Sequence, residues 1–233
     1  MRTALNTTEN CVNATIPDED GVVRVTMDTA VQLTGRSAVR YDKNGEEHYD
    51  ILSAYQKSMR GSDANAALHY LARLLEAGDL PSACRRLMVC ACEDVGLAYP
   101  QIIPIVKSAV DIALQVGLPE AALPLGDAVI MVCQAPKSNT GHDAIIAAMD
   151  DVRKGFTGAV PRHLQNKHYD GDEVAVKGQF YKYPHSYPQH WIKQQYLPDA
   201  LKDKVYYIPG DNKNEQAFAS YWETIKKENG DRS

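Results

Sequence analysis

Apolar residues recur every three or four positions along residues 48–93, and this is the clearest regular pattern in the chain. Such spacing puts them on one side of an α-helix, so the stretch is predicted to be helical. It is broken at RGSD and GDLP, because glycine ends helices and Ser62 or Asp63 can cap the helix that follows. The first two helices carry Tyr49, Leu52, Tyr55 and Met59, and then Ala67, Leu68, Leu71, Leu74 and Leu75.

Further helical segments continue the pattern up to about Gly155. Pro81 falls in the first turn of the next helix, where the missing N–H of proline has no helical partner to lose. These segments have no constant repeat length, which argues against a regular solenoid. The fold class predicted is therefore all-α, a multi-helix bundle. Its later helices are expected at residues 81–96, 101–116, 124–134 and 138–155.

Residues 156–214 form a different segment, in which aromatic residues alternate with prolines and little helical periodicity remains. We expect an irregular strap that packs its rings over the helical body. A short β pair between residues 179–183 and 204–208 is possible within it. A last helix is expected at residues 215–229, with Phe218, Tyr221, Trp222 and Ile225 on one face.

The first 40 residues are too few to hold a core of their own. The segment contains a turn at DEDG, a β-prone run at residues 22–25 and a helix at residues 27–34 that Thr26 caps. A helix could also span residues 2–10, but no capping residue precedes it. Because a natural chain rarely starts inside a helix, we expect a fragment of a longer protein. A polar stretch with an Asn-Gly turn, residues 41–47, separates this part from the main body.

Composition excludes several classes of protein. The net charge is −5, so bulk electrostatics do not predict nucleic-acid binding. The five cysteines form no disulfide framework, which indicates a reducing compartment. Cys90 and Cys92 lie on different faces of a helix, so they are interpreted as small buried residues rather than a metal site. No apolar run is long enough to span a membrane and no signal peptide is present, so a cytoplasmic location is expected.

The residues themselves indicate no catalytic machinery. The sequence contains no phosphate loop, no dinucleotide-binding glycine motif and no H-E-x-x-H zinc motif. The pairs Asp150–Asp151 and Glu93–Asp94 are interpreted as solvated helix faces. The histidines near the strap do not show metal-ligand spacing and are interpreted as surface or core residues: His163, His168, His185 and His190.

A second interpretation concerns the strap. Its aromatic residues are interleaved with Lys177, Lys182, Lys193, Lys202 and Lys204, and such a surface can stack on the bases of a single strand. The alternative function is thus a helical module that binds single-stranded nucleic acid. The negative net charge favours instead that the rings are buried against the helices.

Several motifs, in order, resemble the replication-associated recombination protein A (RarA, also MgsA) family of AAA+ ATPases, which is related to Werner-helicase-interacting protein. The most specific is YDKNGEEHYDILSAYQKSMRGSDANAALHYLARLLEAGD, residues 41–79. The others are ACRRLMVCACEDVGLAYPQ, QAPKSN, VPRHLQN and YKYPHSYPQHWIKQQYLPDALKDKVYYIP. The resemblance covers nearly the whole chain.

This resemblance implies a domain organisation. Residues 1–40 are similar to the second half of an AAA+ lid, and residues 41–233 to the helical C-terminal oligomerisation domain, which forms homotetramers. RTALN matches the end of the family's G-D-x-R-x-x-L-N motif, so Arg2 resembles the sensor-2 arginine that reaches nucleotide phosphates. No other catalytic residue and no metal ligand is implied within this chain.

The resemblance also implies cofactors and partners for a full-length parent. The family binds ATP and Mg²⁺, binds DNA and single-stranded-DNA-binding protein, and acts at stalled forks in DNA replication, recombination and repair. Since this sequence lacks the phosphate loop, no cofactor is expected in it and it should not hydrolyse ATP alone. The expected partner is a second copy of itself, the expected place is the nucleoid of the cytoplasm, and no membrane is expected.

Overall fold

A computed structural model describes residues 8–9, 11–13, 15–18, 20–27, 46–165 and 180–230. The chain divides into two compact units, Met1–His48 and Tyr49–Ser233. In the first unit, Asp18 closes the expected turn: its Oδ1 accepts the backbone N–H of Val22 (2.9 Å) and its Oδ2 accepts Nε of Arg24 (2.7 Å). Residues 22–25 form no strand among the residues described there. Of the helix expected at residues 27–34 all but Met27 lies outside them, and so does most of the polar stretch 41–47.

The helical pattern of residues 48–93 is confirmed. Helix α3 spans Glu46–Arg60, α4 spans Ala64–Glu76 and α5 spans Leu80–Cys90. Asp63 caps α4, since its side chain accepts the N–H of Ala66, and Asp79 caps α5 in the same way through Ser82. Gly78 follows α4 with a φ of 72°, a conformation that glycine adopts without steric cost.

The third helix does not continue regularly to Gly96 as predicted. After Cys90 the chain makes a π-helical turn, Ala91–Val95, and then a 3₁₀ turn, Gly96–Ala98. π-Turns change which residues face inward, and here the change buries Asp94. Helix α6 then spans Ile102–Val116 and α7 spans Ala122–Gln134, so α7 begins two residues before the predicted start at Pro124.

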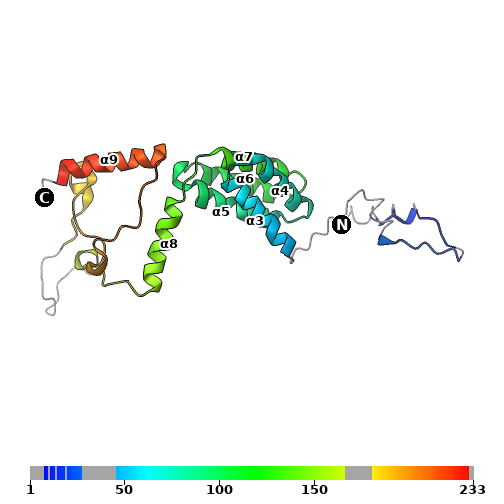
Figure 1. Cartoon of the computed structure of the whole chain (residues 1–233), viewed down its shortest axis with the longest axis horizontal. Helices are drawn as coiled ribbons and strands as arrows, with labels where there is room; N and C mark the ends of the chain where they lie inside the picture. The colour runs from blue at the N-terminus through cyan, green and yellow to red at the C-terminus, as the bar shows by residue number, and fades with distance from the viewer. Residues whose placement is uncertain are drawn as a thin grey trace. The chain divides into compact units, whose positions relative to one another are not determined.

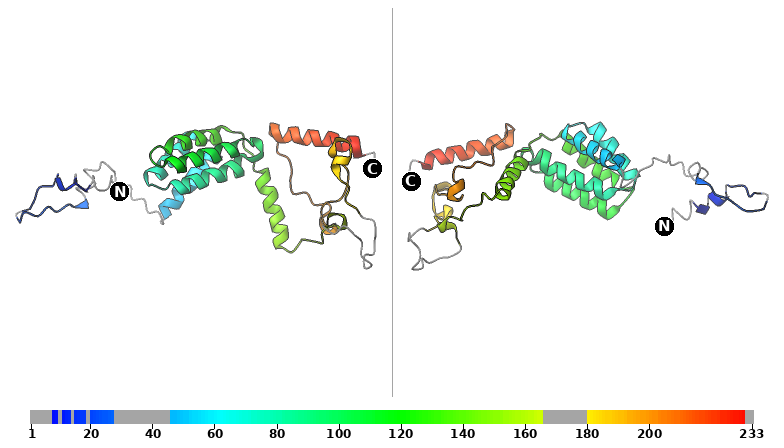
Figure 2. Two further views of the ribbon diagram at one scale, coloured as in Figure 1. Left: turned by 180° about the vertical axis from the view of Figure 1, so that it is seen from behind. Right: turned by 60° about the horizontal axis from the view of Figure 1, so that its bottom comes forward.

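Helices α3 to α7 form one bundle, which Figures 1 and 2 show from several sides. Helix α7 lies against α4 and α6, while α5 lies against α4 and α6. The core contains the fully covered side chains Leu52, Tyr55, Met59, Leu74, Leu87, Ile102, Leu125, Val129 and Val132. The all-α fold class is thereby confirmed for the described part of the chain.

Two helices lie beyond this bundle, α8 (Thr140–Arg153) and α9 (Lys213–Gly230). Both lie against the 3₁₀ turn at Gly96–Ala98. The strap between them contains short 3₁₀ turns at Arg162–Leu164, Pro184–Ser186, Pro188–His190 and Asp199–Leu201. Residues 180–183 and 204–208 form no strands, so the possible β pair is wrong for these residues.

Candidate oligomerisation surface

A polar junction joins the start of α8, the start of α9 and the π-turn, and it positions the surfaces described below. Its first member is Lys137, in the link between α7 and α8. The ammonium group donates to the carbonyls of Val132 (2.9 Å), Cys133 (3.0 Å) and Ala135 (2.8 Å) and to Oγ of Ser62 (2.9 Å). A cation at the C-terminal end of a helix satisfies carbonyls that the helix leaves free. Lys137 thus closes α7 and ties it to the turn before α4.

Ser138 is the second member and contacts both neighbouring elements. Its backbone N–H donates to the carbonyl of Asp94 (2.8 Å), and its Oγ donates to Oε1 of Glu215 (2.5 Å). The chain passes very close to Gly96 here, where a Cβ would lie 3.3 Å from the carbonyl oxygen of Ser138. Gly96 also has a φ of 44°, so both space and conformation favour glycine.

Glu215 is the centre of the junction and is completely buried, with no exposed surface. Its Oε1 accepts from Ser138 and from Nδ2 of Asn212 (2.6 Å). Its Oε2 accepts from Oγ1 of Thr140 (2.7 Å), the hydroxyl of Tyr207 (2.8 Å) and the N–H of Gly210 (2.9 Å). Every neighbour is a neutral donor, so hydrogen bonds rather than a cation hold the carboxylate.

These bonds determine the ionisation of the junction. Burial by itself would raise the pKa of Glu215, but the donors, led by the N–H of Gly210, outweigh it and lower the pKa to about 2. Burial and the bond to Glu215 raise the pKa of Tyr207 to about 12. Both groups therefore keep one protonation state at neutral pH, which is suited to a structural connection and not to proton transfer.

An ion-paired cluster lies on the other side of the π-turn. Nε of Arg60 donates to Oδ1 of Asp94 (2.5 Å), and its Nη2 donates to Oε1 of Glu93 (2.8 Å). Arg86 donates to the amide oxygen of Gln56 (2.9 Å), which connects α5 to α3. The interpretation of Glu93 and Asp94 as a solvated pair is wrong, because Asp94 is buried and both carboxylates are paired.

The two carboxylates of the pair Asp150–Asp151 also differ in their surroundings. Asp150 pairs with Arg153 on the surface, whereas Asp151 is buried and accepts from the hydroxyl of Tyr206 (3.0 Å) and Nζ of Lys204 (2.8 Å). Lys204 and Tyr206 lower the pKa of Asp151 through these bonds. Asp151 is thus the point where the strap attaches to α8.

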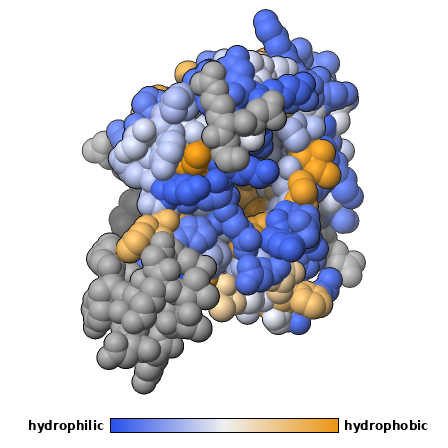
Figure 3. Space-filling model, turned by 90° about the vertical axis from the view of Figure 1, so that its left-hand side faces the viewer, coloured by the Kyte–Doolittle hydropathy of each residue, from blue (hydrophilic) through white to orange (hydrophobic). Residues whose placement is uncertain are grey.

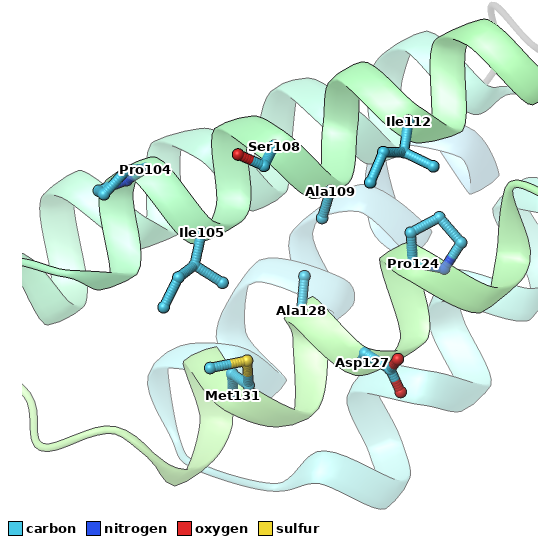
Figure 4. Close-up of a pocket in the computed structure, with 9 residues that line it drawn as sticks. All are labelled: Pro104, Ile105, Ser108, Ala109, Ile112, Pro124, Asp127, Ala128 and Met131. Atoms are coloured by element: carbon cyan, nitrogen blue, oxygen red, sulfur yellow. The ribbon is translucent and has the colours of Figure 1, made fainter.

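Helices α6 and α7 share an apolar groove that faces outward. Its volume is about 440 Å³, and Figure 4 shows Pro104, Ile105, Ser108, Ala109 and Ile112 of α6 opposite Pro124, Asp127, Ala128 and Met131 of α7. Leu123 and Ile130 lie one helical turn from Asp127 on the outward side of α7. Ile112, Met131, Leu123 and Ile130 are 50%, 38%, 73% and 40% exposed. We call the groove with these two residues the α6–α7 apolar surface.

Most aromatic residues of the strap are exposed, contrary to the prediction that they pack over the helices, whereas Tyr187, Trp191 and Tyr206 are half-buried. Phe180 is 72% exposed, Tyr183 59% and Tyr196 51%. Tyr183, His185 and His190 form a row of ring contacts with centroids 5.2 Å and 4.9 Å apart. On the face shown in Figure 3, which is mainly hydrophilic, apolar residues stand out as separate patches.

The sequence-based site residues have different outcomes. Arg2, the sensor-2-like residue, lies outside the described residues, as do His168 and Lys177. Cys90 is buried as predicted, but Cys92 is exposed, so the prediction is wrong for Cys92; Cys84 and Cys133 are also buried. Among the side chains that the structure describes, no group of three histidine, cysteine or acidic residues could hold a metal ion. No helix in the described ranges is long and apolar enough to cross a membrane.

Sequence reasoning missed Glu215 and Lys137. For Glu215 a signal was present: N-x-x-E at residues 212–215 is the pattern of a helix capping box. The backbone N–H of Glu215 does donate to Oδ1 of Asn212 (3.0 Å). Lys137 belongs to the motif QAPKSN. The role of this lysine is visible only in the structure, where carbonyl groups surround its ammonium group.

Comparison with known proteins gives two family matches. The model "MgsA AAA+ ATPase C terminal" matches residues 61–226, and the model "AAA C-terminal domain" matches residues 1–60. Replication-associated recombination protein A of Bacillus subtilis is 50% identical over 97% of this chain and 54% of its own length. The Escherichia coli protein of that name is 33% identical over 89% and 47%, and ATPase WRNIP1 of Dictyostelium discoideum is 32% identical over 80% and 22%. The chain spans about half the length of these bacterial relatives.

Proposed function

Because this chain belongs to the replication-associated recombination protein A (MgsA) family of AAA+ ATPases, we propose that it is the region that assembles such an ATPase into a homotetramer. The observation that carries the proposal is the α6–α7 apolar surface. Residues 101–136 contain only four charged side chains, Lys107, Asp111, Glu120 and Asp127. Large apolar side chains of these residues are exposed on the α6–α7 apolar surface. Contiguous exposed apolar patches on soluble proteins mark interaction sites.

A tetramer with closed two-fold symmetry uses two different self-complementary contacts, and the α6–α7 apolar surface would supply one of them. The α6–α7 apolar surface suits such pairing, because Asp127 is the one charged residue among those that form it, so little charge would be desolvated in a contact between identical faces. The polar junction supports this pairing, because the hydrogen bonds of Lys137 and Glu215 fix α7, α8 and α9 in one arrangement.

The oligomeric state tests the proposal directly. Light scattering or sedimentation of the chain at micromolar concentration should give the mass of a tetramer. Ile112→Lys should reduce that mass, because it puts a charge into the groove. Leu114→Lys is the matched control: Leu114 is exposed to a similar extent on the same helix but does not line the groove. A monomeric chain, or equal masses for the two variants, would contradict the proposal.

The proposal extends to the parent protein. ATP and Mg²⁺ would bind an ATPase module outside these residues, with Arg2 directed at the nucleotide phosphates. DNA and single-stranded-DNA-binding protein would be partners of that whole ATPase at stalled replication forks, in the nucleoid of the cytoplasm. The chain alone should show no ATP turnover with or without DNA. Measurable turnover would contradict this assignment.

A second candidate function is favoured by one observation on the strap. Residues 180–196 contain six phenylalanine, tyrosine and tryptophan residues, two lysines and no acidic residue, although the chain as a whole is negative. The exposed rings of Phe180, Tyr181, Tyr183 and Tyr196, with the half-buried Trp191 beside them in the chain, could stack on the bases of a single strand. Fluorescence anisotropy with a labelled oligothymidylate should then show salt-dependent binding that weakens at least about fivefold in Trp191→Ala and Tyr196→Ala. Tyr221→Ala, an exposed aromatic residue of α9, is the control.

A further inference from the structure

Residues 182–194 of the strap form a closed loop, which we call the 182–194 loop. The side-chain amide of Gln194 closes its base: Oε1 accepts the backbone N–H of Lys182 (3.2 Å), and Nε2 donates to the carbonyl of Lys182 (2.8 Å). The two ends of the loop are therefore held together by hydrogen bonds. Compact surface loops of about 6–16 residues whose ends lie close together frequently carry function.

The tip of the loop is fixed to the end of α9. Nε2 of Gln189 donates to Oε2 of Glu228 (2.6 Å), and Oε1 of Gln189 accepts from Nδ2 of Asn229. Asn229 is buried, and its amide also donates to the carbonyl of Ile225 (3.0 Å). Helix α9 thus occupies both polar atoms of the Gln189 side chain, so the tip cannot move without breaking these bonds.

These bonds hold the tip in an unfavourable backbone conformation. Gln189 and His190 have φ values of 53° and 55°, in the left-handed region that residues other than glycine rarely adopt. Such conformations persist where the surrounding contacts impose them, and they cluster at functional sites. Here the contacts are those between Gln189 and α9. Helix α9 therefore determines how the next side chain, that of His190, is presented.

The fixed tip completes a row of three exposed rings. The ring centroid of His190 lies 4.9 Å from that of His185, which lies 5.2 Å from that of Tyr183. The planes of neighbouring rings are inclined by 49° and 47°, so the rings do not form a closed parallel stack. All three residues are exposed. We call them the ring row, and exposed aromatic rings in succession form the kind of surface on which the bases of a single strand stack.

The charge of the loop favours a ligand that carries phosphates. The 182–194 loop contains Lys182 and Lys193, both exposed, and no aspartate or glutamate. Glu228, the carboxylate that contacts the loop, accepts from the amide of Gln189. Lysines bind the phosphates of a nucleic acid without regard to sequence, and aromatic rings bind its bases. The loop offers both kinds of contact over a short stretch of chain.

We propose that the 182–194 loop is the element that binds a single-stranded nucleic acid, that the ring row stacks on its bases, and that α9 positions this row through Gln189. This inference rests on the second candidate function and names the site that carries it. Asn229 and Glu228 are positioning residues: they touch no base, but they fix Gln189 and with it the ring row.

Two labelled probes of equal length, an oligothymidylate and an abasic strand, separate base stacking from phosphate contact. The native chain should bind the oligothymidylate at least about fivefold more tightly, because only this strand offers bases to the rings. Tyr183→Ala, Gln189→Gly and Asn229→Ala should each reduce this preference below about twofold and leave the affinity for the abasic strand unchanged. Glycine adopts a positive φ without steric cost, so the loss in Gln189→Gly would report the lost contacts with α9.

A matched control and a second measurement accompany these variants. Thr224 is exposed one turn before Glu228, and its hydroxyl donates to the carbonyl of Ser220 in the same helix, so Thr224→Ala should keep the native preference. Circular dichroism verifies that the α9 variants remain helical. In Asn229→Ala the N–H of His190, whose acceptor is the carbonyl of Tyr187, should exchange faster because the tip is released.

Salt dependence distinguishes a positioning residue from a phosphate contact. Lys182→Gln and Lys193→Gln should each make the plot of log affinity against log salt concentration shallower by about 0.7, the value for one phosphate contact on a single strand. Both variants should keep the preference for the oligothymidylate. Asn229→Ala should leave the slope unchanged, because α9 contributes no phosphate contact. A shallower slope in Asn229→Ala would overturn the positioning role.

The failure of this inference can be told apart from that of the second candidate function. If the native chain binds neither probe, both are wrong. If it binds the oligothymidylate and the variants Gln189→Gly and Asn229→Ala retain the full preference for bases, the candidate function stands and the positioning of the ring row by α9 is wrong. If Tyr183→Ala also retains it, the ring row is not the stacking surface.

Discussion

Ser138 and Glu215 are 77 positions apart in the chain, and the hydroxyl of Ser138 donates to the carboxylate of Glu215 over 2.5 Å. The same serine holds the π-turn through its backbone N–H. This contact links the bundle to both helices beyond it. Its weakening should therefore affect α8 and α9 together.

Glu215→Gln should lower the free energy of unfolding by about 3 kcal/mol near neutral pH, because several donors lose a charged acceptor and one now faces an amide N–H₂. Urea unfolding monitored by circular dichroism measures the change. Asp211→Asn removes a charge from the strap near the junction, and as the matched control it should change stability by only a few tenths of a kcal/mol.

The stabilisation by Glu215 should also depend on pH. Its native pKa of about 2 lies below its ordinary value of 4.5, so the contribution is complete above pH 4.5 and is lost as the pH falls through about 2. The difference in stability between the native chain and Glu215→Gln should shrink steadily over that window. Urea midpoints of both proteins across this range measure it, and a constant difference would contradict the low pKa.

Arg60 and Asp94 should be energetically coupled. Arg60→Ala leaves Asp94 buried without its cation and should cost about 2 kcal/mol, a value reduced because the arginine side chain is 46% exposed. In an Asp94→Asn background the same change should cost about 1 kcal/mol less, since no buried charge remains. A double-mutant cycle in urea measures the coupling, and additive effects would rule it out.

Lys137 should contribute more to stability than an exposed lysine does. Lys137→Met removes the donor to three carbonyls at the end of α7 and should cost about 2 kcal/mol. Lys107→Met is the control, because Lys107 is 62% exposed and its ion pair with Asp111 should contribute less than about 0.5 kcal/mol. Thermal unfolding compares the two, and equal shifts in Tm would show that Lys137 is not a structural cap.

Gly158 should be required where the strap returns to the region after α8. A Cβ at Gly158 would lie 2.6 Å from Cβ of Pro198, whereas nothing lies within 4 Å of one at Gly155. Both glycines have positive φ, so comparing their alanine variants isolates the contact. In Gly158→Ala, but not in Gly155→Ala, the N–H of Leu201 should exchange faster, because its acceptor is the carbonyl of Pro198.

Much of the fold was predictable because helix ends are local. Asp63 caps α4, Gly78 follows it and Pro81 opens α5, as the residue types near each break indicate. The predictions that failed concern residues whose burial depends on contacts with distant parts of the chain. The π-turn buries Asp94 against Arg60, and most tyrosines of the strap are exposed although their composition suggested burial.

The sequence by itself determined the helices, their approximate ends and the family, because capping side chains, glycine, proline and apolar spacing act within a few residues. Only the tertiary structure decided which polar groups are buried and which apolar faces stay uncovered. Glu215 is buried by residues from two separate parts of the chain, 138–140 and 207–212, whereas Ile145, Met149 and Val152 of α8 stay exposed. Burial depends on what the fold brings alongside a residue, and neighbours along the chain do not contain that information.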